Sequence, residues 1–152
     1  SEGQSGDRLR RLFRATADGG RTLEAWYDDE IGVTCAFLVA ADGDERCLPT
    51  NPRAVPIRLL YTDDACSLPV AFVEADAYGT LPAAFSYRLP GSFGMRARRL
   101  SYNVGRPDSL YSINFVDGGP SCVESPVGDG LFYQVEPELS PSAFIAGTVE
   151  ID

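Results

Sequence analysis

Apolar and polar side chains alternate along most of this chain, in short runs bounded by glycine, proline and aspartate. Leu23, Ala25 and Tyr27 share one parity, for example. A period of two is typical of strands with one buried face. We therefore predict short strands at 8–16, 23–28, 35–40, 45–48, 57–62, 70–74, 84–88, 98–104, 110–116, 131–136 and 146–151, with one helical turn at 140–144 started by Ser140 and Pro141.

The stretch 10–49 has an echo at 98–136. Arg-Arg-Leu, an aromatic residue two places before Asp, a cysteine and Asp-Gly follow in the same order, at offsets of 87 to 89 residues. We predict an N-terminal tail at 1–7 and a single all-β domain at 8–152. Its expected form is an antiparallel meander with internal repeats, in a small propeller-like or closed sheet. A two-sheet β-sandwich is the alternative.

Composition narrows the classes of function. The 152 residues carry a formal net charge of −9, and the 13 basic residues are all arginine, without lysine or histidine. Phosphate backbones are bound by basic surfaces, so we expect no nucleic acid partner. Without histidine the chain lacks the usual general base and the commonest zinc ligand, and we predict no catalytic set, no metal and no cofactor. It has no apolar run of the length that spans a membrane.

Four cysteines are present, at Cys35, Cys47, Cys66 and Cys122. Their even number, without a Cys-x-x-Cys pair, favours the disulfide framework of an exported protein over a metal site. Free thiols in a cytosolic protein are the alternative. A start at Ser1 without Met is typical of a mature exported chain, and equally of a trimmed one.

Of the three connectivities, we favour Cys35–Cys47 with Cys66–Cys122. The first pair meets one objection. If Asp42-Gly43 formed a two-residue hairpin turn, Cys47 would face Leu38 and not Cys35. A bulge or a longer loop is then needed to bring the two Cα atoms within roughly 7 Å.

Acidic turns recur at 28–30, 42–45 and 63–64. Calcium binds where six to eight oxygens converge, but no stretch has the spacing of an EF-hand loop. Aspartate is also the residue that hairpin turns require. We retain Asp28, Asp63 and Asp64 as candidate binding residues and predict no metal.

Trp26 is the other candidate binding residue, because its parity is opposite to that of Ala25 and Tyr27. An outward tryptophan stacks on a sugar ring or anchors a protein partner, whereas the alternative is a second buried face. A carboxylate-based hydrolase would need two acids roughly 5–9 Å apart. Its candidates are Glu24, Glu74 and Glu136, which lie in or at the ends of strands.

One block resembles a signature of uncharacterised secreted proteins and lipoproteins of myxobacteria-like bacteria. It reads Cys35-x-Phe37-x-x-Ala40-x-Asp42-Gly43-x-x-Arg46-Cys47-Leu48-Pro49, with Asp28 upstream, Tyr61-x-Asp63-x-x-Cys66-x-x-Pro69 downstream and Pro141–Thr148 near the end. The resemblance implies export and paired cysteines, and it implies no activity. Residues 76–97 match nothing in that signature.

Three functions follow, in order of preference. The first is an exported, disulfide-stabilised, non-catalytic structural or assembly-forming surface protein, which associates with itself through sheet edges or the N-terminal tail. The second is a monomeric extracellular module that binds a glycan or a protein at Trp26 and the acidic loops. The third is the hydrolase. We expect the chain outside the cell or at the cell surface.

Overall fold

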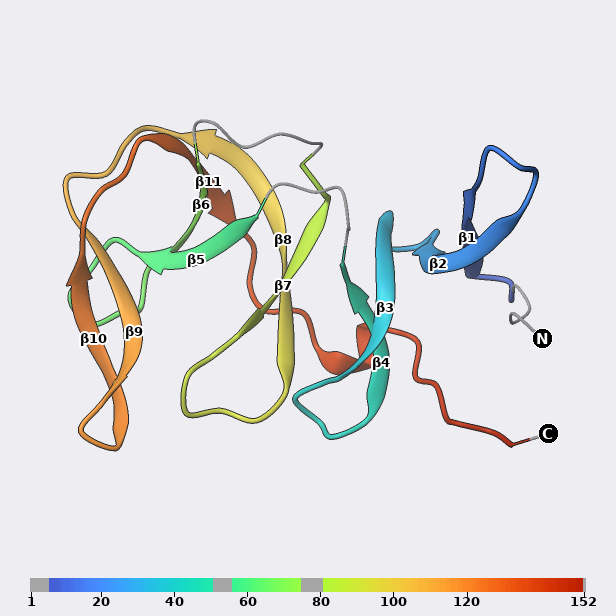
Figure 1. Ribbon diagram of the computed structural model, residues 1–152. Coiled ribbons are helices and arrows are strands. Elements are labelled where there is room, and N and C mark those ends of the chain that lie inside the picture. The colour runs from blue at the N-terminus through green and yellow to red at the C-terminus, as the bar shows by residue number, and fades with distance from the viewer. Residues whose placement is uncertain (1–5, 51–55, 75–80, 152) are drawn as a thin grey trace.

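The computed structural model describes residues 6–50, 56–74 and 81–151, which form eleven strands and one 3-10 helix (Figure 1). The strands are β1 Leu9–Ala15, β2 Arg21–Asp28, β3 Val33–Val39, β4 Glu45–Pro49, β5 Ile57–Tyr61, β6 Pro69–Glu74, β7 Ala84–Arg88, β8 Met95–Val104, β9 Leu110–Val116, β10 Gly119–Ser125 and β11 Gly130–Val135, and the helix is η1 Pro141–Ala143. The predicted all-β class is confirmed. None of the helical structure in these ranges is long and apolar enough to cross a membrane.

The described strands lie in two antiparallel sheets. β1 to β4 form one sheet in chain order, and the other has the order β10-β9-β5-β6-β11-β8-β7. The two-sheet alternative therefore fits, rather than a propeller-like or closed sheet. The echo at 98–136 does not reproduce the meander of 10–49, because β8 pairs with β7 and β11 whereas β9 pairs with β10 and β5.

The two sheets meet where β3 and β4 approach β7 and β8. The core at this junction consists of buried residues from both sheets and the C-terminal segment: Ile31, Val33, Ala40, Leu48, Ala84, Ala97 and Phe144. Gly94 permits the close approach, because a Cβ there would lie 2.3 Å from the Ala40 carbonyl oxygen. Its φ of +78° also favours glycine. Burial of this core joins the small sheet to the large one.

The seven-stranded sheet buries side chains on both faces. On one face the rings of Phe72 and Phe132 pack with centroids 5.1 Å apart, among Leu60, Val70 and Leu110. The other face carries Ala71, Phe85 and Val135. This sheet therefore has an aromatic core of its own.

The β3–β4 hairpin resolves the objection to the first disulfide. Its loop is Ala41–Gly43, closed by hydrogen bonds from Gly43 N–H to Ala40 O (3.0 Å) and from Ala40 N–H to Asp44 O (2.9 Å). A three-residue loop with a left-handed glycine shifts the register by one residue. Cys47 consequently lies opposite Phe37, on the face of Cys35, and the Cys35–Cys47 disulfide forms across a Cα–Cα distance of 5.1 Å.

The second disulfide, Cys66–Cys122, is also confirmed, with a Cα–Cα distance of 5.8 Å. It joins the β5–β6 turn to β10. Strand β10, which contains Pro120, is not among the strands predicted from the sequence. Proline is tolerated there because β10 is an edge strand of the large sheet.

The prediction of a last strand at 146–151 is wrong. One antiparallel bridge, Arg46–Ala146, is all that forms there among the described residues. Beyond it β4 has already turned into its loop, so residues 148–151 have no strand edge beside them. The helical turn is confirmed as η1, although the Ser140 hydroxyl bonds Ser142 and caps no backbone N–H. Residues 1–5 of the predicted tail lie outside the described ranges.

Candidate binding site

An apolar hollow of about 400 Å³ lies on the four-stranded sheet, next to the start of β1. Its walls are Leu9, Trp26, Phe37 and Ile145, and its rim is formed by residues 6–8. We call this site the Trp26 hollow. The strand register places the first three walls on one face of the sheet, and the C-terminal segment brings Ile145 beside them. The hollow therefore combines residues from both ends of the chain.

The floor of the Trp26 hollow is covalently fixed. Cys35 and Cys47 are both 0% exposed and form one cluster with Leu9, against which the remaining walls pack. Their disulfide joins β3 to β4 directly beneath the apolar surface. Because the floor cannot spread apart, the shape of the hollow is set before anything binds in it.

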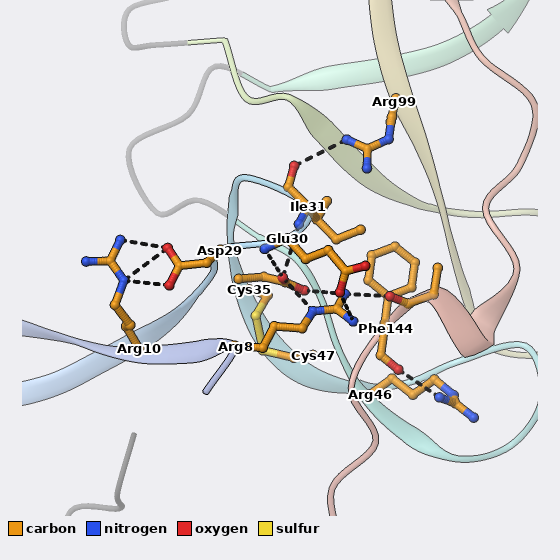
Figure 2. Close-up of polar contacts among 12 residues, drawn as sticks. Arg8, Arg10, Asp29, Glu30, Ile31, Cys35, Arg46, Cys47, Arg99 and Phe144 are labelled. Carbon is orange, nitrogen blue, oxygen red and sulfur yellow. Dashed lines mark hydrogen bonds and ion pairs between the residues drawn. A yellow bond between two sulfur atoms is a disulfide. The ribbon is translucent and has the colours of Figure 1, made fainter. Parts of the chain in front are cut away.

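Arg8, which lines the hollow and is labelled in Figure 2, forms a buried ion pair with Asp28. Asp28 is 0% exposed, and Arg8 donates to both of its carboxylate oxygens, from Nε at 2.8 Å and from Nη2 at 2.9 Å. The backbone N–H groups of Glu30 and Ile31 donate to the same carboxylate at 3.0 and 3.1 Å. The buried charge is thus fully hydrogen-bonded, as a buried carboxylate requires.

Two arginines hold the segment that carries Ile145. Arg8 Nη2 donates to the Ala143 carbonyl at 2.6 Å, and Arg46 Nη1 donates to the Phe144 carbonyl at 2.8 Å (Figure 2). Arg46 is itself held by Asp42, whose carboxylate lies 2.8 Å from Nη2. Consecutive carbonyls are therefore fixed on either side of the chain, and this fixes the wall that Ile145 forms.

Gly147 shapes the wall that Phe37 forms. A Cβ at this position would lie 2.6 Å from the ring of Phe37. The same residue donates its N–H to the Glu45 carbonyl at 2.9 Å. The backbone therefore passes directly over the Phe37 ring, and a larger residue would displace that ring.

The surroundings of the Arg8–Asp28 ion pair keep both groups charged. Burial of the Asp28 carboxylate favours a raised pKa, but the hydrogen bonds from Arg8 and from the backbone N–H groups outweigh it, so the pKa lies below its ordinary value. The Asp28 hydrogen bond raises the pKa of Arg8 against the opposing effect of burial. Both groups therefore stay charged at neutral pH.

The sequence-predicted binding residues do not share one site. Trp26 lines the hollow, whereas the Asp28 carboxylate is buried and occupied by Arg8, so it is not open to a ligand. Asp63 and Asp64 follow β5 in the other sheet. The Asp63 carboxylate accepts the N–H groups of Ser67 and Leu68 at 2.9 Å each, and in this way it closes the β5–β6 turn.

The candidate hydrolase acids are also separated. Glu24 lies on the small sheet and pairs with Arg14. Glu74 is opposite Gly130 at the start of β11, and Glu136 follows the end of that strand. Six residues of strand span roughly 20 Å, which is too far for two carboxylates to act on one glycosidic bond.

A larger hollow of about 540 Å³ lies over the seven-stranded sheet. Leu60, Phe72 and Leu110 are among its lining residues, together with Glu74 and Asp129. The Asp129 side chain is 98% exposed, so it is solvated at the edge of this hollow. Within the described ranges no group of three or more His, Cys, Asp or Glu residues could hold a metal ion.

Sequence reasoning missed Leu9, Phe37 and Ile145 as walls of the hollow. Phe37 stands two residues after Cys35, and this spacing puts both on one face of a strand. That signal was available in the sequence. The sequence carries no such signal for Ile145, because its position depends on hydrogen bonds to residues about a hundred positions away.

Together these features define a class: a small, two-sheet, disulfide-stabilised all-β protein with a preformed apolar hollow. The chain belongs to the family of unknown function DUF7481, whose family model matches residues 2–137. No curated protein and no solved structure matches the chain. The family match includes three walls of the Trp26 hollow and ends before Ile145.

Proposed function

We propose that this chain is an exported, non-catalytic surface protein that binds a partner molecule in the Trp26 hollow. The observation that carries the proposal is the hollow itself, a concave surface with two aromatic walls on a sheet fixed by a disulfide. Its volume lies within the roughly 300–1,000 Å³ that is typical of binding pockets. The partner expected from such walls is the apolar face of a sugar ring or an apolar protein side chain.

The rigidity of the hollow supports a binding role. A partner loses less affinity when the site does not have to be ordered first. Here the disulfide fixes the floor, and the guanidinium groups of Arg8 and Arg46 fix the wall at Ile145. Binding of a partner therefore requires little free energy for reorganisation of the site.

The two disulfides support export. Disulfides persist in oxidising compartments outside the cytosol, and both described pairs are formed. An extracellular or cell-surface location is therefore part of the proposal. An origin in myxobacteria-like bacteria is also part of it, and it is supported by the sequence resemblance alone. A non-catalytic role is part of it too, and the separation of Glu24, Glu74 and Glu136 supports this role.

A second candidate function is structural self-assembly. The observation in its favour is a pair of apolar side chains, Val149 and Ile151, which are 84% and 96% exposed. Single exposed apolar residues are common on protein surfaces. Here two of them share one strand parity and give the segment an apolar face, which a neighbouring copy could cover.

Trp26 gives a direct test, because it is the only tryptophan of the chain. Its indole N–H yields a single resonance, and glycan fragments and short apolar peptides are titrated while that resonance is observed. We expect at least one class to shift it saturably. The matched control is Phe115→Ala, which removes an aromatic ring that is 60% exposed on the other sheet and should leave binding unchanged. Ligands that bind Phe115 and leave the indole unshifted would contradict the proposal.

A further inference from the structure

The described arginines of this chain are almost all paired. Their partners are carboxylates, backbone carbonyls, the Tyr87 hydroxyl or an aromatic ring. Among the described residues, Arg58 and Arg88 are the two arginines without an ion pair, a hydrogen bond or a ring contact. Both line the same small cavity of about 150 Å³ on the seven-stranded sheet. We call this cavity the Arg58–Arg88 pocket.

The Arg58–Arg88 pocket forms where two strands of the sheet diverge. Among the described residues, β5 pairs with β9 at one position, Tyr61 opposite Tyr111. Figure 1 shows the β9–β10 hairpin running away from β5 beyond that pair. Residues 58–61 of β5 and 112–114 of β9 line the pocket, together with the end of β7 and residues 89–90. A regular sheet would hold the two strands roughly 5 Å apart, so their divergence leaves room for a ligand.

The walls of the pocket are held in place on two sides. The Cys66–Cys122 disulfide joins the β5–β6 turn to β10, and Cys122 lies opposite Ile113 of β9. On the side of β7, the loop that follows this strand packs on β10, because a Cβ at Gly91 would lie 3.1 Å from Pro120 Cγ. The shape of the pocket is therefore set by the fold, and a ligand does not have to order the walls first.

Tyr61 lines the pocket and carries an unused hydrogen-bond donor. The residue is 7% exposed, and its hydroxyl forms no hydrogen bond with any described residue. Burial raises the pKa of Tyr61, with Asp63 and Glu138 adding to the shift and Arg98 opposing it. The hydroxyl therefore stays protonated at neutral pH. Because so buried a hydroxyl has little access to water, an acceptor placed in the pocket would stabilise it.

The pocket lacks a negative charge of its own. No acidic side chain is among the residues that line it, although the chain has 22 Asp and Glu residues. The two carboxylates whose charge reaches Tyr61 have partners elsewhere, since Asp63 accepts N–H groups of its own turn and Glu138 pairs with Arg96 at 2.7 Å. Asn114 Oδ1 accepts the Ser112 hydroxyl at 3.3 Å, which leaves the Nδ2 hydrogens to donate. The pocket therefore offers positive charge and hydrogen-bond donors.

We propose that the Arg58–Arg88 pocket binds an oxyanion, either as a free anion or as the acidic group of one sugar residue. Guanidinium groups bind such anions through charge-assisted hydrogen bonds, which are stronger than those between neutral groups. The Tyr61 hydroxyl and the Asn114 amide supply further donors. A cavity of about this volume holds one six-membered ring. The site lies on the other sheet from the Trp26 hollow, so its test does not depend on the proposed function.

Titration with sulfate, glucuronate and glucose tests the pocket. Each is added to the isotope-labelled chain at constant ionic strength, so that screening does not change, while the backbone amide resonances are followed. We expect saturable shifts at residues 112–114 from at least one of the two anions, and none from glucose, which has no charge. Tighter binding of glucuronate would identify an acidic sugar as the ligand, and tighter binding of sulfate a free oxyanion. Shifts from neither anion, or equal shifts from glucose, would overturn the inference.

Three variants test the groups that hold the anion. Arg58→Gln and Arg88→Gln each remove one charge, and both residues are exposed, so neither change disturbs the fold. We expect each to weaken anion binding at least about tenfold, and Tyr61→Phe to weaken it about three- to tenfold. The matched control is Arg21→Gln, which removes the same charge from an exposed arginine of the four-stranded sheet. Equal weakening by this control would show an effect of net charge alone and would overturn the inference.

Discussion

The two sheets of this protein are stabilised in different ways. The seven-stranded sheet has a core of large side chains, in which Phe72 and Phe132 pack ring against ring. The four-stranded sheet has a buried disulfide and a buried ion pair, Arg8–Asp28, in place of such a core. A small sheet buries too little apolar surface to be stable alone. The comparison shows that an ion pair and a disulfide stabilise the sheet whose apolar surface is exposed in the Trp26 hollow.

The large sheet has its own polar cluster, of a different kind. Tyr87 accepts a hydrogen bond from Arg98 Nε at 2.9 Å and donates one to Glu138 at 2.9 Å. Burial raises the pKa of Tyr87 to about 12, with Glu138 adding to the shift and Arg98 opposing it. This group titrates in alkali, whereas Asp28 titrates in acid. The two regions should therefore lose stability at opposite ends of the pH scale.

The largest difference in stability between the two sheets is expected when one aspartate in each is replaced by asparagine. Asp28→Asn leaves the Arg8 charge without its buried partner, and we expect it to lower the free energy of unfolding by about 3–5 kcal/mol. Asp63→Asn weakens the hydrogen bonds of a surface turn and should cost about 1 kcal/mol. Urea unfolding with both disulfides intact measures the difference. Equal losses would contradict the structural role assigned to the ion pair.

Acidification should remove the stability that the charged Asp28 carboxylate contributes, up to the loss expected from Asp28→Asn. Because the pKa of Asp28 is lowered in the folded state, its contribution is complete above the unfolded pKa of about 3.9 and is lost as pH falls through the folded value. We expect the stability gap between wild type and D28N to close as pH is lowered from neutrality to about 2. A gap that stays constant over that range would contradict the pKa direction.

Removal of each disulfide should separate stability from binding. The Cys66–Cys122 pair closes 56 residues and the Cys35–Cys47 pair closes 12. By loop entropy, their replacement with alanine pairs should cost about 4 and about 3 kcal/mol respectively. Only the replacement of Cys35 and Cys47 loosens the floor of the hollow, so only this variant should change the fluorescence of Trp26. A change in Trp26 emission from both variants would show that the hollow depends on the whole fold.

The smallest effect concerns the wall at Phe37. Gly147→Ala places a methyl group on the Phe37 ring, and we expect a loss of about 1–3 kcal/mol together with a change in ligand binding. Gly105→Ala is the matched control in the loop that follows β8 of the large sheet, where a Cβ meets nothing within 4 Å. It should alter stability by less than about 0.5 kcal/mol. Similar losses from both would contradict a specific contact at the Phe37 ring, because the effect of Gly→Ala on the unfolded chain is stabilising.

Much of the fold could be predicted because its determinants are local. The alternation at Leu23, Ala25 and Tyr27 marks β2, and the favoured pairing of the four cysteines is the one that forms. The last strand failed for a physical reason, since Val149 and Ile151 have strand preference but no edge beside them. The reverse occurred at β10, which was not predicted and which tolerates Pro120 because it is an edge strand.

The candidate site was less accessible to sequence reasoning. Trp26 was identified from its parity, but Asp28 was taken as a binding residue when it is a buried partner of Arg8. That pair joins residues 20 positions apart and leaves no periodic signal. The wall at Ile145 depends on contacts across almost the whole chain. Sites assembled from such long-range contacts become visible once the strands are placed.

The central claim is that the Trp26 hollow is a binding surface, and titration of glycan fragments and short apolar peptides while the fluorescence of Trp26 is followed tests it most directly. We predict a saturable blue shift with at least one of these ligand classes, which Phe115→Ala leaves unchanged. An emission maximum that no added glycan or peptide shifts would contradict the claim.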